Sequence, residues 1–271
     1  MKYVIAVDLE GIGGVVGAPY DKLILGHKDY DLAVTNAVRE INAAVSALFD
    51  SGAELVAVWD NHGGGNNIDF SLIDKRAIQV SDKGRPYRFD LANDHAYDGV
   101  VYLGYHAREG SFEGVLAHSY NSTDIQYCRV NGDDKGEIEL DSYIAADHGI
   151  APIFAASDKA CIEQFKELSP NSVTVITKYG KSRNEAILRD EDEVVNEIYN
   201  GVKEGAKKVK EIPLPKLPMP AEVEMRYTRA ERAYEKLEKI SARGDIKVRF
   251  GRDTHTLLFT VNSAKEIVLL F

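Results

Sequence analysis

Carboxylate and imidazole side chains follow three separate apolar segments of this chain. They are Asp8 and Glu10 after residues 3–7, His62 after residues 55–59, and His106 after residues 100–105. Carboxylates are costly to bury without a partner that balances their charge. Mixed carboxylate and imidazole ligands suit zinc, and manganese or cobalt can take the same places. These residues therefore indicate a metal site, and a metal site that acidifies water favours hydrolysis.

Two further residues with suitable chemistry lie downstream. Glu137 stands in the acidic segment 136–141, for which a solvated surface is the alternative interpretation. Together with Asp8 and Glu10 it would supply three negative charges, which two divalent ions and one bridging hydroxide would neutralise. His118 could act as a proton donor, a base or a nucleophile beside such metals. A hydrogen-bonded core histidine is the alternative for His118.

Several polar residues near these positions could contact a substrate. The glycine-rich run 63–65, followed by Asn66 and Asn67, lacks the Gly-Lys-Ser/Thr ending of a phosphate-binding loop, so it is better suited to a sharp turn or a close backbone approach. Arg108, Lys178 and Arg183 could bind a substrate carboxylate, with a solvated surface position as the alternative for each. We name Arg108 and Asn67 as the substrate-binding candidates.

Composition excludes several classes of function. The 271 residues carry a formal net charge of -10, and the basic residues form no dense run apart from a short mixed stretch near Lys207, so we expect no nucleic-acid partner and no anionic membrane surface. Two separated cysteines form no CxxC pair, which fits a reducing compartment. The first apolar run is too short for a signal peptide. We therefore expect a cytoplasmic protein without a membrane span.

The elements that must position these residues have the pattern of an α/β protein. Continuous apolar runs at 3–7, 55–59, 100–105, 152–156 and 173–176 indicate strands that are covered on both faces. Helical patterns separate several of these runs, at about 34–48, 158–168 and 192–209. This order predicts a three-layer fold, with a mainly parallel sheet and helices on both faces.

A proline-rich stretch divides the chain. Four of the eight prolines lie within residues 213–220, which favours an extended linker. Residues 221–271 then show an alternating strand pattern, a helical face and further short strands, which we interpret as a small α+β unit packed on the main domain. We expect a catalytic α/β domain at 1–212, a linker at 213–220 and this unit at 221–271.

Five short motifs together resemble a known family. They are Asp8-Leu9-Glu10-Gly11, Asp60-Asn61-His62, Gly104-Tyr105-His106-Ala107-Arg108, Leu116-Ala117-His118-Ser119 and Gly136-Glu137. In order and spacing, over roughly the first 200 residues, the series resembles the zinc-dependent D-aminopeptidases of the dipeptide-permease operon type.

The resemblance implies a binuclear zinc site. Asp8 would be the shared ligand, and Glu10, His62, His106 and Glu137 would complete the two metals. His118 matches a residue with a direct catalytic role. The implied substrates are short peptides with a free N-terminal D-residue, D-alanine especially. The implied assembly is a ring-shaped homodecamer of two stacked pentamers that encloses the active sites.

Two alternatives remain open. One is a metal-dependent phosphohydrolase, although haloacid-dehalogenase phosphatases need Asp and metallophosphoesterases need His at the position of Glu10. The other is a non-enzymatic, metal-dependent assembly protein. Assays against phosphate esters and against D- and L-peptides separate the three.

Overall fold

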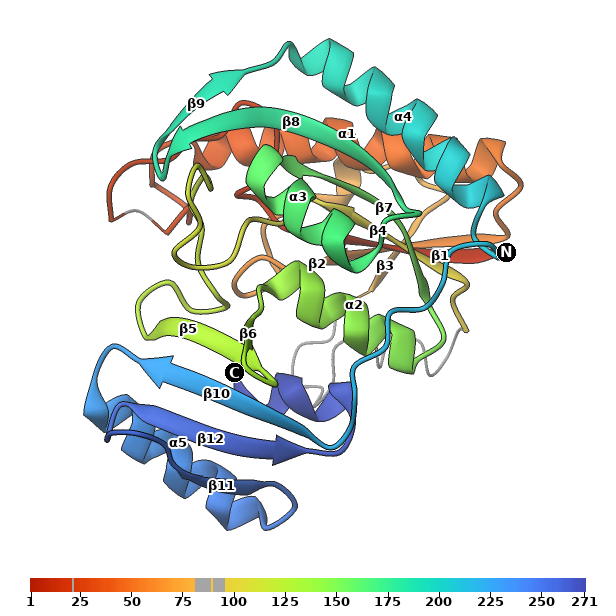
Figure 1. The fold of residues 1–271 in the computed structure, drawn as a ribbon. Coiled ribbons are helices and arrows are strands. Elements are labelled where there is room, and N and C mark those ends of the chain that lie inside the picture. The colour runs from red at the N-terminus through yellow and green to blue at the C-terminus, as the bar shows by residue number, and fades with distance from the viewer. Residues whose placement is uncertain (21, 81–88, 90–95) are drawn as a thin grey trace.

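The main sheet contains all five strands that the apolar runs predict. The computed structural model describes residues 1–20, 22–80, 89 and 96–271, and within them the strand order of this sheet is β3-β2-β1-β4-β7-β8-β9 (Figure 1). The strands are β1 (Lys2–Val7), β2 (Leu55–Asp60), β3 (Ile78–Val80), β4 (Gly99–Leu103), β7 (Ala151–Asp158), β8 (Val173–Ser182) and β9 (Glu185–Leu188). Neighbouring strands pair in parallel except β8 and β9, so the predicted mainly parallel sheet is confirmed.

Helices cover both faces of this sheet. Figure 1 shows α1 (Tyr30–Asp50) and α4 (Glu191–Lys207) on one side, and α2 (Glu137–Asp147) and α3 (Lys159–Leu168) on the other. Alternation along β1 explains the two cores: Ile5 packs in the cluster with α1 and α4, whereas Ala6 packs in the cluster with α2 and α3. The predicted three-layer architecture is confirmed. Of the described helices, none is long and apolar enough to cross a membrane.

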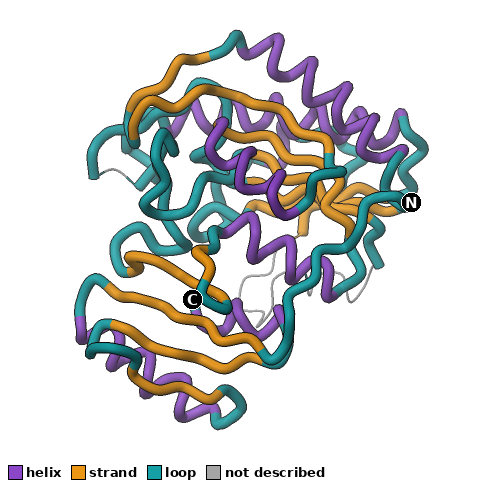
Figure 2. The backbone as a smooth tube through the Cα atoms, viewed as in Figure 1, coloured by secondary structure: helices purple, strands orange, loops and turns teal. Residues whose placement is uncertain are grey.

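A second, antiparallel sheet lies beside the first (Figure 2). Its order is β11-β12-β10-β5-β6, and its strands are β5 (Ile125–Val130), β6 (Asp133–Asp134), β10 (Ala221–Tyr227), β11 (Lys247–Phe250) and β12 (Thr256–Val261). Helix α5 (Ala230–Arg243) packs against it, and the 3₁₀ helices are η1 (Phe70–Leu72) and η3 (Ala264–Leu270). Because β10 pairs with β5, this sheet joins segments from both sides of the linker. The division at 213–220 stays a proposal.

Candidate metal centre

Close backbone packing joins the ends of β1 and β4. The amide of Asp8 donates to Leu103 O at 2.8 Å, and the amide of Gly11 donates to Gly104 O at 2.7 Å. A Cβ on Gly104 would overlap the carbonyl oxygen of Asp8, and Gly104 also has a φ of +72°, so glycine is required there. This contact brings the carboxylates after β1 next to His106, which follows β4.

The loop after β2 is held by Asp60. Its carboxylate accepts hydrogen bonds from the amides of Asn67 at 2.6 Å and Ile68 at 3.0 Å, and from Asn67 Nδ2 at 3.0 Å. Asn67 Nδ2 also donates to the carbonyl of His62 at 2.7 Å. Asn67 therefore supports the loop that carries His62 and lies outside the cavity described below. The Asp60 carboxylate is occupied by hydrogen bonds within this loop.

His118 and Glu137 lie next to His106. His118 comes from the segment between β4 and α2, and Glu137 comes from the start of α2. The imidazole of His118 stacks on that of His106, with 3.8 Å between ring centroids and 13° between planes. Glu137 is the first residue of α2, and its Oε1 accepts from the Tyr120 amide at 2.6 Å. The same Oε1 lies 3.1 Å from His106 Nε2 and 3.7 Å from His118 Nε2.

The three imidazoles share one arrangement of their nitrogens. Each places one ring nitrogen against a backbone carbonyl: His62 Nε2 on Leu23 O at 2.9 Å, His106 Nδ1 on Ala107 O at 3.0 Å, and His118 Nδ1 on Leu116 O at 2.9 Å. A carbonyl can only accept, so in the neutral form of each ring the hydrogen sits on that nitrogen and the lone pair on the other. The other nitrogen of each ring faces carboxylates, which is the orientation that metal-ligating histidines adopt.

The donor atoms converge closely enough to hold metal ions. Ligand atoms of Asp8, Glu10 and His106 all lie within 4.8 Å of one another, and so do those of His106, His118 and Glu137. His62 Nδ1 lies 2.8 Å from Asp8 Oδ1 and 3.2 Å from Glu10 Oε2. All six predicted ligand and catalytic residues are thus brought together.

Two observations indicate that this donor set fits a cation. Glu10 Oε2 and His106 Nε2 are buried and complete no hydrogen bond with the described residues. Burial opposes protonation of His62, yet the carboxylates of Glu10 and Asp8 raise its pKa to about 12. The carboxylates therefore create a strongly negative potential in a buried place, and zinc suits the mixed imidazole and carboxylate donors.

His118 differs electrostatically from the other two imidazoles. Burial lowers its pKa below the usual value, and the neighbouring His106 lowers it further. Burial likewise opposes the charged form of His106, but Glu137 raises the pKa of His106 to about 10. The neutral form of His118 is thus favoured, with its lone pair on Nε2.

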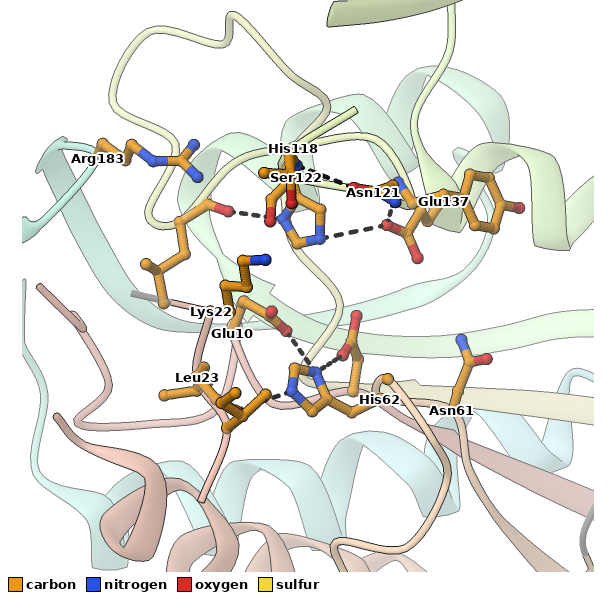
Figure 3. Close-up of a pocket in the computed structure, with 16 residues that line it drawn as sticks. Glu10, Lys22, Leu23, Asn61, His62, His118, Asn121, Ser122, Glu137 and Arg183 are labelled. Carbon is orange, nitrogen blue, oxygen red and sulfur yellow. Dashed lines mark hydrogen bonds and ion pairs between the residues drawn. The ribbon is translucent and has the colours of Figure 1, made fainter. Parts of the chain in front are cut away.

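Apart from the buried His106, these groups line a cavity of about 340 Å³ (Figure 3). Its remaining lining includes Lys22, Leu23, Asn61, the segment 120–123 and Arg183. Arg108 lies outside this cavity, with Nη1 at 3.4 Å from Glu139 Oε2. Of these residues, Leu23 contributes a backbone carbonyl, for which sequence offers no signal.

The acidic segment that follows Glu137 is buried, so its interpretation as a solvated surface is wrong. Glu139 is 2% and Asp141 0% exposed. Glu139 Oε2 accepts from the Gly136 amide at 2.8 Å, which secures the start of α2. Asp141 accepts from the hydroxyls of Tyr105 at 2.7 Å and Tyr120 at 3.0 Å. Both carboxylates hold the surroundings of Glu137 in place.

Comparisons with known proteins bear on the fold and the family of this chain. A curated relative, the D-aminopeptidase of Bacillus subtilis (strain 168), is 30% identical over 185 residues, which are 68% of this chain and 66% of the relative, just under two thirds of its length. The fold is similar to that of the Zn-dependent D-aminopeptidase DppA from Bacillus subtilis, described as a self-compartmentalizing protease. That match has a TM-score of 0.86 and 22% identity, and covers 100% of this chain and 95% of the other.

The model of the D-aminopeptidase family matches residues 1–263, nearly the whole chain. This span includes all six residues of the cluster and both sheets. The chain therefore belongs to the D-aminopeptidase family.

Proposed function

We propose that this protein is a zinc-dependent aminopeptidase that hydrolyses short peptides with a free N-terminal residue, D-residues such as D-alanine in particular. The observation that carries the proposal is the convergence of three carboxylates and three imidazoles, all of which except the buried His106 line a cavity of about 340 Å³. Membership of the D-aminopeptidase family supports the reaction class. The cavity is at the small end of the roughly 300–1,000 Å³ typical of ligand sites, which suits a short peptide.

The proposed metal content is two zinc ions per subunit, with manganese or cobalt as possible replacements. Asp8 would be shared by both ions, and the other ligands would be Glu10, His62, His106 and Glu137. Bound metal supplies two things in such a site: it acidifies water and polarises a carbonyl.

His118 is the proposed catalytic residue. Its Nδ1 hydrogen is held by Leu116 O, and stacking on His106 fixes the plane of the ring. Nε2 is therefore the atom that can accept a proton and pass it to the leaving amine. A covalent role for the same nitrogen is the alternative, and trapping of an acylated protein would reveal it.

Assembly into a homo-oligomeric ring, with a decamer as the expected size, and a cytoplasmic location complete the proposal. The structurally similar DppA is described as self-compartmentalizing. Several large apolar side chains are also strongly exposed, among them Tyr20 at 99%, Leu25 at 79% and Phe112 at 96%, and a subunit contact would cover them. Light scattering measures the mass directly, and a monomer at micromolar concentration would contradict the ring.

The central test combines metal analysis with matched substrates. Zinc-loaded protein is assayed against D-Ala and L-Ala dipeptides and tripeptides and against phosphate esters. We expect peptide hydrolysis that chelator abolishes, and about two zinc ions per chain. His118→Ala should lower turnover roughly 10²–10⁴-fold with the zinc content unchanged. Fewer than one metal per chain, together with activity that survives chelator, would refute the proposal.

A further inference from the structure

The cavity at the metal centre is electrostatically asymmetric. Its floor carries the carboxylates of Asp8, Glu10 and Glu137. Among the described residues that line it, the lysine and arginine side chains are Lys22 and Arg183. In the view of Figure 3, Arg183 and Glu137 lie on opposite sides of His118. Two divalent ions would offset these three carboxylates, so the uncompensated charges at the cavity are cationic and suit an anionic group of a ligand.

The backbone holds Arg183 firmly at this place. Arg183 lies in the turn between β8 and β9, and its carbonyl accepts from the Leu116 amide at 2.8 Å. Its Nη1 donates to the carbonyl of Ala117, the residue before His118. These two bonds fix the guanidinium beside the catalytic imidazole, so its position is built into the fold.

The charge of Arg183 is incompletely balanced. The carboxylate oxygen Glu109 Oε2 lies 3.9 Å from Nη1, beyond hydrogen-bond reach, and the Arg183 side chain is 43% exposed. One nitrogen of the guanidinium serves Ala117, which leaves donors for an incoming oxyanion. A planar guanidinium suits a carboxylate because it can donate two hydrogen bonds at once.

The other cationic candidates fit this role less well. Lys178 is fully buried and donates to Glu10 O at 2.5 Å and Ile12 O at 2.7 Å. Arg108 faces Glu139 outside the cavity. Lys22 lines the cavity, but it is exposed and lies on the loop before α1. Among the described residues, no side chain or carbonyl holds its ammonium group in place.

We propose that Arg183 binds the C-terminal carboxylate of the substrate, and that dipeptides with a free C-terminus are therefore the preferred substrates. This inference rests on the proposed aminopeptidase activity. A dipeptide spans about 7 Å, so its carboxylate lies one residue beyond the bond that is cut. The bond that is cut lies at the metal centre, and Arg183 takes the carboxylate one residue beyond it.

The test compares D-alanyl-D-alanine with its C-terminal amide, which differs by one negative charge. Wild-type protein should favour the free acid in kcat/KM, and Arg183→Gln should lower the acid-to-amide ratio roughly 10- to 100-fold, chiefly through KM. Arg183→Lys should keep part of the preference. Lys181→Gln removes a positive charge from the end of the adjoining strand β8, outside the cavity, and should keep the wild-type ratio.

The ratio separates recognition from support of the active site. If Arg183 acted merely by holding Ala117 beside His118, both substrates would lose activity equally and the ratio would stay constant, which would overturn the proposal. Loss of the ratio in Lys22→Gln but not in Arg183→Gln would also overturn it.

A binding measurement tests this inference separately from the proposed function. Calorimetry of the same acid and amide with zinc-loaded His118→Ala protein measures the contact without turnover. No hydrolysis by wild type would reject the aminopeptidase, while an acid preference that Arg183→Gln removes would still support the carboxylate contact. Equal binding of acid and amide to protein with Arg183 intact would reject the contact itself.

Discussion

Replacement of Gly104 by alanine tests whether close packing of two strand ends builds the metal centre. Gly104 has a φ of +72°, and its Cβ position overlaps the carbonyl of Asp8. Gly52 is a matched control, because its φ is +85° but nothing lies within 4 Å of its Cβ position. The two substitutions share the backbone cost and differ in the contact with the metal ligand loop.

The expected magnitudes follow from these two terms. An alanine forced into left-handed backbone conformation costs about 1–2 kcal/mol, which is the whole effect expected for Gly52→Ala. Overpacking against a backbone adds about 1–3 kcal/mol at Gly104, so Gly104→Ala should lose about 2–5 kcal/mol of unfolding free energy. Since Asp8 must move to relieve the overlap, zinc affinity should also fall, and a displacement of about 1 Å can cost roughly a hundredfold in turnover.

Two assays separate stability from site geometry. Urea unfolding of the metal-free variants gives the two free energies, and zinc titration against a chromophoric chelator gives the affinities. Gly52→Ala should bind zinc like wild type. Equal destabilisation by both substitutions, with equal zinc affinity, would refute the claim that the Gly104 contact positions Asp8.

Three further predictions follow from buried polar groups and from the metal. Burial raises the pKa of Glu40 to about 8, above its value near 4.3 in an unfolded chain. The native state therefore binds more protons than the unfolded state between these two values. The free energy of unfolding should fall as pH rises from about 4.5 to 8, by at most about 1.4 kcal/mol per pH unit. In urea unfolding across that pH range, Glu40→Gln should flatten the decline in unfolding free energy, whereas Glu185→Gln, at an exposed position, should leave the decline unchanged. Equal declines in the two variants would contradict the assignment of this pH dependence to Glu40. Tyr120→Phe removes the hydroxyl that donates to Asp141 and should cost about 1.5–3 kcal/mol in the same assay, against no change for Tyr179→Phe. Chelator should lower the melting temperature, since zinc at a hundred times its Kd stabilises by about 2.7 kcal/mol, and a melting curve indifferent to zinc would argue against a metal site in the native state.

The main sheet was predictable because its strands are covered on both faces and are therefore uniformly apolar. That pattern identified β1, β2, β4 and β7, which are buried along nearly their whole length, and also the apolar first half of β8, a strand that is only partly buried. The edge strands β3 and β9 are short and partly exposed, so they lack the signal. Helix α2 hides its amphipathic pattern, because polar residues such as Asp141 and Ser142 are buried on it.

Residue type and strand position indicated the candidate ligands, but not the residues around them. Parallel strands place their carboxyl ends at one edge, which gathers Asp8, Glu10, His62 and His106 from chemistry and topology alone. The direction of a loop side chain depends on bonds to distant residues instead. Asp60 turns Asn67 toward the loop, and Glu139 lies within reach of the Arg108 guanidinium. Neither contact has a periodic sequence pattern.

The candidate metal centre also depends on the second sheet, through the chain segment from the end of β4 to the start of α2, which supplies His118 and Glu137. Tyr120 joins the two: its amide donates to Glu137 Oε1, and its ring stacks on Phe271 with 3.7 Å between centroids. Strand β5 lies in the same segment, between Tyr120 and α2, and pairs with β10, which follows the proline-rich stretch. The position of Glu137 is therefore set from both sides, by His106 at the main sheet and by Tyr120 at the second. Because the fold ties these contacts together, loosening the second sheet should weaken metal binding without touching a ligand.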